Sequence, residues 1–406
     1  MEKVRPSVHG GSNLTPKRSL SGRRILVLSA TVPDQHSAAF TTSYYSKMDT
    51  FQNIKFQGLD RVWLRGKLYS ASQRGPAVIL TPGYNVVLDN FPPGVPEEFQ
   101  KAGITALVYD PRNTGTSGGF PRNDINPFKQ TEDYSDAFIY LSRLPIVDSK
   151  AIFFWGISLS AGIALSAAAI DRRIAGVIAI APIFEFVPVK AADSRRLKTK
   201  LMKDRESQVI HGNPPYILPL MESLAEIPFN SHVNANEGQE VNQDVTKEDV
   251  VEQVEPSENH RREILNGEDF DATLTHNPYG TTIQSYHRMF LFEPVPLAMV
   301  RQVNPTPIFF LTPELDQISP PERQTEVFQS LHGPKRQFIA PGKEHIYVLH
   351  GSTMPAFMKL QSDFVWQAVK GQFKRDGEHE ALPASINMPV RQDVPTMVDD
   401  REEITV

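Results

Sequence analysis

Short apolar runs alternate with helical stretches along most of the chain, and this pattern limits the possible folds more than any other feature. Runs such as 77–81 and 151–156 are nearly uniformly apolar, which is typical of strands covered by helices on both faces. The alternation predicts an α/β fold with a mainly parallel, doubly wound sheet. The predicted strands are 53–69 (a hairpin), 77–81, 105–110, 151–156, 177–181, 307–312 and 336–341, and the predicted helices are 96–102, 133–144, 161–170, 321–331 and 355–373.

One long segment interrupts the alternation. About 120 residues, 184–303, separate two consecutive predicted strands, whereas a tight connection has roughly 2–6 residues. We therefore expect a helical cap inserted into the core. The expected organisation is a basic, Ser/Thr-rich, disordered arm (1–50), a core in two parts (51–183 and 304–375), the cap or lid (184–303) and a disordered acidic tail (376–406).

The composition excludes several kinds of site. The chain has no cysteine, which rules out a disulfide framework, a thiolate metal site and a catalytic cysteine. No run approaches the roughly 20 apolar residues of a membrane span. A net charge of -5 disfavours nucleic acid as a partner. The chemistry must therefore use an oxygen nucleophile, histidine, carboxylates or lysine, and we expect no cofactor and no metal.

The first 47 residues carry seven Lys or Arg side chains against two acidic ones, with abundant Ser and Thr. This is the composition of an import presequence, but also of a disordered arm or of an extension upstream of a true start at Met48. We expect a cytoplasmic protein, or a mitochondrial one if residues 1–47 are a genuine presequence. The oligomeric state is left open, with a dimer as one alternative.

A candidate nucleophile lies in the phrase Gly156-Ile-Ser158-Leu-Ser160, between an apolar run and an Ala-rich helical stretch. A serine in a sharp strand-to-helix turn needs small residues two positions before and after it, because the backbone approaches closely there. The usual last residue is glycine, so Ser160 is a departure. We predict Ser158 as the nucleophile, with Ser160 as the alternative.

The acid and base of a serine hydrolase follow the nucleophile in the order Ser, Asp or Glu, His. Asp316 lies in the loop after predicted strand 307–312, and His345 lies in the loop after 336–341. Both loops fall at the carboxyl end of the sheet, where active sites of open parallel sheets lie. We predict Asp316 and His345, with Glu314 and His350 as their rivals.

Two other loops belong to the same edge. Tyr84 follows predicted strand 77–81, where such enzymes place one oxyanion-hole amide, so the backbone N–H groups of Tyr84 and Leu159 are predicted to bind the oxyanion. The loop from Asp110 to Ser117 resembles the Asp-x-Arg-Gly-x-Gly-x-Ser loop of α/β hydrolases, and this resemblance implies an architectural role for it.

These elements and their order resemble the α/β-hydrolase superfamily over residues 51–190 and 303–373. Within it, the strand that opens at Phe51 and the loops 81–85, 110–115 and 156–160 resemble fungal polyketide transferase-like or thiohydrolase-like hydrolases of secondary-metabolite clusters. That group is related to dienelactone hydrolases and Xaa-Pro peptidases. The resemblance implies acyl transfer on a polyketide-like ester or thioester, which a polyketide synthase carrier domain could deliver.

The expected function is a serine hydrolase or acyltransferase with an acyl-serine intermediate. The alternatives are a Xaa-Pro-type peptidase, a dienelactone-hydrolase-like enzyme and a non-catalytic binding protein of the same fold. Charge runs in 190–205 and 234–271 are expected to be solvated surface. Apolar side chains elsewhere in the inserted segment are the candidates for substrate contact, namely Phe184, Tyr216 and Phe290, together with Phe186 and Phe229.

Overall fold

The computed structural model describes residues 51–185, 191–219 and 280–373, all of which belong to the unit Asp49–Val406. An eight-stranded sheet runs through them in the order β1-β2-β4-β3-β5-β6-β9-β10. β1 and β2 form an antiparallel hairpin, β2 pairs antiparallel with β4, and every other neighbouring pair is parallel. The strands are β1 Gln52–Gln57, β2 Trp63–Tyr69, β3 Gly75–Thr81, β4 Thr105–Tyr109, β5 Val147–Ile157, β6 Gly176–Ile180, β9 Ile308–Pro313 and β10 Lys335–Ala340. The predicted mainly parallel α/β sheet is confirmed.

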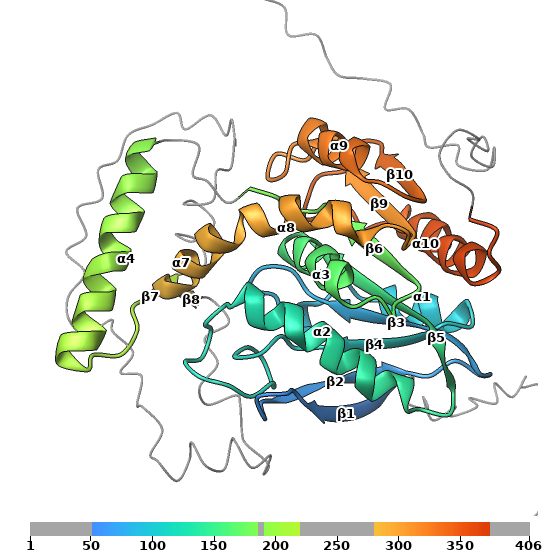
Figure 1. The fold of residues 1–406 in the computed structure, drawn as a ribbon, viewed down its shortest axis with the longest axis horizontal. Helices are drawn as coiled ribbons and strands as arrows, with labels where there is room; N and C mark the ends of the chain where they lie inside the picture. Colours follow the sequence, from blue (N-terminus) through green and yellow to red (C-terminus); the bar gives the residue numbers. More distant parts are fainter. Residues whose placement is uncertain (1–50, 186–190, 220–279, 374–406) are drawn as a thin grey trace, which may run out of the picture. The chain divides into compact units, whose positions relative to one another are not determined.

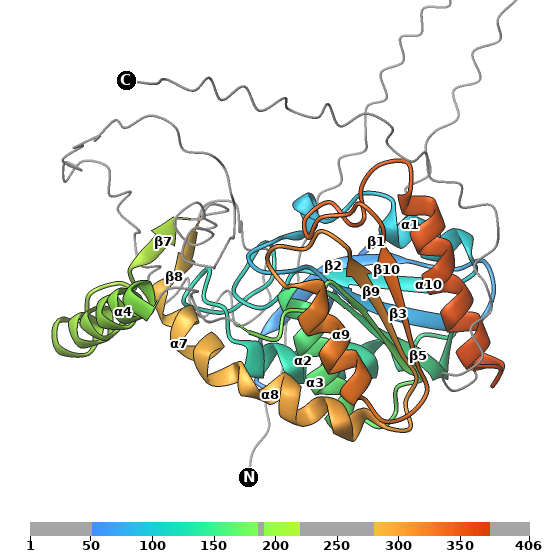
Figure 2. The same cartoon turned by 90° about the horizontal axis from the view of Figure 1, so that it is seen from above.

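Helices cover both faces of this sheet (Figure 1, Figure 2). On one face lie α2 (Pro127–Ser142), α3 (Leu159–Ile170) and α9 (Pro321–Ser330), and on the other lie α1 (Val95–Lys101) and α10 (Met354–Val369). A 3-10 turn, η1 (Leu88–Asn90), precedes α1.

Residues 151–156 of the central strand β5 are apolar because helices cover both faces of this part of the strand. Ile152 and Phe154 pack into the core beneath α2 and α3, whereas Phe153 and Trp155 pack into the core beneath α1 and α10. Alternate side chains of a strand point to opposite faces, so a strand between two helical layers has no polar side. All four side chains are fully buried.

Helix α2 begins six residues earlier than the sequence pattern suggested. Asn126 caps it by accepting a hydrogen bond from Lys129 N at 3.3 Å, and Pro127 occupies the first turn. An Asn–Pro pair is a favourable helix start, because the asparagine oxygen satisfies a free amide and proline needs no partner for one. The earlier start brings Gln130 to the carboxyl end of the sheet, beside the loop after β3.

The segment between β6 and β9 contains α4 (Ala191–His211), β7 (Ile217–Pro219), β8 (Gly280–Thr282), α7 (Ile283–Phe292), α8 (Pro294–Met299) and η3 (Val300–Val303). β7 and β8 pair antiparallel, and α4 packs on α7, where Gln284 Nε2 donates to Leu201 O at 3.0 Å. Val300 and Val303 of η3 are buried in the same core cluster as α3. The end of the segment is therefore continuous with the core layer.

In the described parts of the chain, no helix is both long and apolar enough to cross a membrane. The predicted arm 1–50, the tail 376–406 and the entire acidic run 234–271 lie outside the described residues.

Candidate active site

Ser158 occupies the sharp turn between β5 and α3. Its backbone has φ 61° and ψ -124°, a conformation that costs energy for any residue with a Cβ. A Cβ added at Gly156 would lie 2.2 Å from Ser160 O, so a glycine is required two positions before the serine. Ser158 N donates to Ile180 O at 2.9 Å, which fixes the turn on the neighbouring strand. Strained backbone of this kind is typical of functional turns.

Ser160, which stands where a glycine is usual, has a structural task. Its buried Oγ accepts a hydrogen bond from Ile157 N at 2.9 Å and lies 2.8 Å from Thr81 O, to which it can donate. The hydroxyl thereby ties the serine turn to the end of β3. The serine hydroxyl, which a glycine would lack, thus links the turn that carries Ser158 to the end of β3.

Ser158, His345 and Asp316 meet at the carboxyl end of the sheet. His345 Nε2 lies 2.8 Å from Ser158 Oγ, and His345 Nδ1 lies 2.8 Å from Asp316 Oδ2. Asp316 and His345 are buried, whereas Ser158 is partly exposed. The three side chains come from loops after β5, β9 and β10, the strand ends named in the sequence analysis.

Neighbours orient the Asp316 carboxylate. Its Oδ1 accepts from Ile318 N at 2.9 Å and from Ser319 N at 2.7 Å. Its Oδ2, the atom that faces His345, also accepts from Gln324 Nε2 at 2.9 Å. Sequence reasoning missed Ser319 and Gln324. The spacing of Asp316 and Ser319 is that of a side chain closing a turn on the backbone a few residues later, a signal that could have identified the first of them.

The two rival residues make other contacts. Glu314 is exposed, and its Oε2 accepts from Gly342 N at 2.6 Å. His350 lies with its ring 5.8 Å from the ring of Tyr347, in an edge-on arrangement. The structure therefore brings Asp316 and His345, rather than Glu314 and His350, to Ser158.

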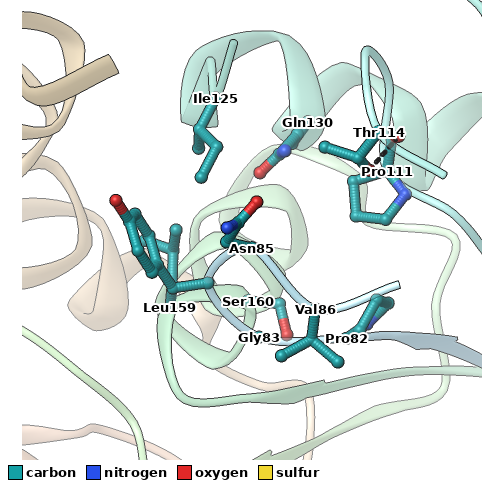
Figure 3. A pocket seen from close by; sticks show the side chains of 11 residues that line it. Pro82, Gly83, Asn85, Val86, Pro111, Thr114, Ile125, Gln130, Leu159 and Ser160 are labelled. Atoms are coloured by element: carbon teal, nitrogen blue, oxygen red, sulfur yellow. Dashed lines mark hydrogen bonds between the residues drawn. The ribbon is translucent and has the colours of Figure 1, made fainter. Parts of the chain in front are cut away.

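The loop after β3 passes directly beside Ser158. A Cβ added at Gly83 would lie 3.2 Å from Ser158 Cβ and 3.7 Å from Ser158 Oγ. Tyr84 and Leu159, the two predicted oxyanion-hole residues, line one small cavity at this edge of the sheet (Figure 3). The Tyr84 hydroxyl lies 3.2 Å from the Tyr286 hydroxyl, so this loop also contacts α7.

The loop after β4 lines the same small cavity, and buried charged side chains fix its conformation. Asp110 Oδ1 accepts from Leu88 N at 2.8 Å and its Oδ2 accepts from Thr116 N at 2.7 Å. Arg112 bridges Asp133 on α2 and Asp60 on the hairpin turn. Burial raises the pKa of Asp133 to about 6, against the opposing effect of the Arg112 hydrogen bond. These contacts are consistent with the architectural role predicted for this loop.

Several hydrogen bonds and one ion pair, the Asp124–Arg288 joint, attach the inserted segment to the core. The sequence pattern did not predict these contacts. Arg288 Nη1 on α7 and Thr282 Oγ1 both donate to Asp124 Oδ1, at 2.6 and 2.7 Å. Asn123 Nδ2 donates to Gly280 O at 2.7 Å. Burial raises the pKa of Asp124, although Arg288 partly opposes this.

The three predicted substrate-contact residues occupy different environments. Phe184 is buried in the core, with its ring stacked 6.3 Å from that of Phe310. Tyr216 is 49% exposed. Phe290 lines a cavity of about 470 Å³, where Lys198 Nζ lies 5.3 Å from its ring centre. Phe186 and Phe229 lie outside the described residues.

The described residues contain no group of three His, Asp or Glu side chains that could hold a metal ion. The serine, histidine and aspartate at this edge of the sheet can couple proton transfer to nucleophilic attack.

Comparison with known proteins agrees with the fold. The family described as the alpha/beta hydrolase fold matches residues 76–351. A thiohydrolase of Eupenicillium brefeldianum is 39% identical over 314 residues, which are 77% of this chain and 93% of that protein. A polyketide transferase, ATR5, of Stachybotrys chlorohalonatus is 35% identical, covering 79% and 98%. The solved structure of DcsB in complex with its substrate analogue superposes with a TM-score of 0.62 at 31% identity, covering 78% and 99%. The chain belongs to the α/β hydrolase family and, within it, to a group of fungal enzymes that includes thiohydrolases and polyketide transferases.

Proposed function

We propose that this enzyme transfers an acyl group from an ester or thioester through an acyl-Ser158 intermediate. The observation that supports the proposal is the pair of consecutive hydrogen bonds from Ser158 Oγ to His345 and from His345 to Asp316, both at 2.8 Å. A serine hydroxyl is a weak nucleophile until an adjacent base takes its proton, and this geometry supplies that base.

The reaction would proceed in two halves. His345 Nε2 takes the Ser158 proton as Oγ attacks the acyl carbonyl, and Asp316 accepts the Nδ1–H bond and stabilises the imidazolium. The Tyr84 and Leu159 backbone N–H groups bind the developing oxyanion. His345 then protonates the departing thiol or alcohol. Water attacks the acyl-enzyme to complete hydrolysis, or a docked alcohol attacks to complete transfer.

The named relatives support the proposed substrate class. Proteins called thiohydrolase and polyketide transferase are 39% and 35% identical to this chain, which supports a polyketide-like acyl thioester as the substrate. A carrier domain would deliver it. Supporting this, α4 exposes a run of cations suited to an acidic partner surface. They are Arg195, Arg196, Lys198, Lys200, Lys203 and Arg205.

A charge reversal tests delivery by a carrier. Lys203→Glu should raise KM severalfold for a carrier-bound acyl chain while leaving KM for a small-molecule thioester unchanged, because surface charge acts mainly on encounter. If the wild-type enzyme and the Lys203→Glu variant have equal KM values for the carrier-bound acyl group, this part of α4 has no docking role.

The proposal also covers the cellular compartment of the reaction. We place the reaction in the cytoplasm, and the alternative is the mitochondrion if residues 1–47 act as a presequence. A fluorescent reporter fused to residues 1–47 should remain cytoplasmic. Import of the reporter would overturn this assignment.

Labelling with a fluorophosphonate probe tests the nucleophile. The probe should add covalently to Ser158, and Ser158→Ala should abolish labelling. Ser166→Ala is the matched control, since Ser166 lies on α3, the helix that Ser158 precedes, and its Oγ donates to Gly162 O at 2.9 Å. Labelling that survives in Ser158→Ala would contradict the proposal.

A further inference from the structure

A small cavity lies behind the loop that carries Tyr84. It has a volume of about 10 Å³ and lies between the loop after β3, the start of α3, the loop after β4 and the start of α2 (Figure 3). Most of its lining is apolar. The lining residues are Pro82, Gly83, Tyr84, Asn85, Val86, Pro111, Thr114, Ile125, Gln130, Leu159 and Ser160.

Asn85 places an unsatisfied amide in this cavity. The residue is 9% exposed, and neither its Nδ2 nor its Oδ1 has a hydrogen-bond partner among the described residues. A buried amide without partners is rare in folded proteins, because it loses its hydrogen bonds to water without replacement. Asn85 therefore needs a partner that the described residues do not supply.

The backbone of Asn85 links this amide to the reaction. Asn85 has φ 51°, in the left-handed region, within a turn closed by the bond from Val86 N to Gly83 O at 3.3 Å. Tyr84 lies inside the same turn. A contact that holds the Asn85 side chain therefore also holds the orientation of the Tyr84 peptide.

Gln130 supplies a second amide to the same space. It lies on the first turns of α2 and is 9% exposed. The amide groups of Asn85 and Gln130 are both directed into the cavity in Figure 3. Thr114 and Ser160 use their hydroxyl groups elsewhere, since Thr114 Oγ1 donates to Pro111 O at 2.7 Å and Ser160 Oγ is bonded as described above.

We propose that this cavity binds a single ordered water, held by Asn85 and Gln130, which fixes the turn that presents Tyr84 to the oxyanion. The cavity has room for one water-sized sphere, and two amides offer the several donors and acceptors that a buried water requires. A substrate group larger than a single heavy atom would not fit. Asn85 and Gln130 are in this scheme positioning residues for the proposed acyl transfer, on which the kinetic part of the inference rests.

The test combines a crystal structure with kinetics of two variants. Gln130→Met keeps the length and helix propensity of the side chain but removes its amide. Asn85→Gly removes the other amide and suits the left-handed backbone. Each variant should lower kcat by about 10-fold with KM within about 2-fold, less than the ~10²-fold cost of losing an oxyanion donor outright. The double variant should be no slower than either single variant, because both residues hold the same water.

The control is Gln329→Met, which makes the same change at an exposed position of α9 and should leave kcat unaltered. The crystal structure of the wild-type enzyme should show one water within about 3.2 Å of both Asn85 and Gln130. A dry cavity, or an Asn85 amide bonded directly to a substrate analogue, would overturn the site. A water that is present while both variants keep the wild-type kcat would overturn the positioning role. Failure of the acyl-transfer proposal would instead appear as the absence of Ser158 labelling, and the crystal structure would still decide the water site.

Discussion

Ser158 and His345 stand 187 residues apart in the chain, yet Ser158 Oγ and His345 Nε2 lie 2.8 Å apart. The parallel sheet makes this approach possible, because β5 and β10 end at the same edge and each delivers its loop there. Asp316, from the loop after β9, lies on the far side of the imidazole.

The first prediction concerns Ser158 and His345 as a unit. Ser158→Ala and His345→Ala should each lower kcat by roughly 10⁴-fold or more, and the double variant should be little worse, because neither residue performs the attack without the other. Steady-state kinetics on an acyl thioester measure all three variants. Multiplicative losses in the double variant would show that the two side chains act independently.

The second prediction distinguishes Asp316 from Glu314. Asp316→Asn should lower kcat by roughly 10³- to 10⁴-fold, because an amide NH₂ facing His345 Nδ1 favours the wrong imidazole tautomer. Glu314→Gln should change kcat by less than about 3-fold, since Glu314 is exposed and its carboxylate accepts from the Gly342 amide rather than from His345. The reverse order of effects would reassign the acid.

The third prediction concerns the joint between Asp124 and Arg288. Arg288→Met should lower the free energy of unfolding by about 1–3 kcal/mol, because it leaves the buried Asp124 carboxylate with less compensation. This value lies below that for a fully buried pair, since the Arg288 side chain is 31% exposed.

A double-mutant cycle provides the control for that joint. Asp124→Asn combined with Arg288→Met should recover part of the loss seen in Arg288→Met alone, as denaturant titration would show. Additive losses in the cycle would mean that the two side chains contribute to stability separately.

The strand ends and the residues that follow them could be predicted from the sequence, because a buried strand has a readable apolar pattern and the serine turn has a fixed spacing of small residues. Ser158, Asp316 and His345 each follow such a strand, and the structure brings them together. Their catalytic roles remain predictions.

The supporting contacts could not be predicted in the same way. Asp124 and Arg288 are 164 residues apart and belong to no periodic pattern, so nothing in the sequence pairs them. The loop that carries Tyr84 could be placed after predicted strand 77–81, but the unsatisfied amide of Asn85 depends on the residues that α2 and α3 place around it. Ser160 read as a departure from the usual glycine, and only its bonds to Thr81 and Ile157 show what the hydroxyl does.

The fourth prediction concerns the substrate. Each methylene buried from an acyl chain is worth about 0.8 kcal/mol, so kcat/KM should rise severalfold per added methylene across a short series of acyl thioesters. A Xaa-Pro anilide should be cleaved far more slowly than the best thioester. A flat chain-length profile, or faster cleavage of the anilide, would favour the peptidase alternative.

The covalent intermediate is the most direct test of the proposed function. Rapid mixing with an acyl thioester, followed by acid quenching and intact-protein mass spectrometry, should reveal a protein heavier by one acyl group, and peptide mapping should place that group on Ser158. Ser158→Ala should give no adduct, and Ser166→Ala should give the wild-type amount. Turnover without any acyl adduct under single-turnover conditions, or an adduct mapped to a residue other than Ser158, would contradict the account.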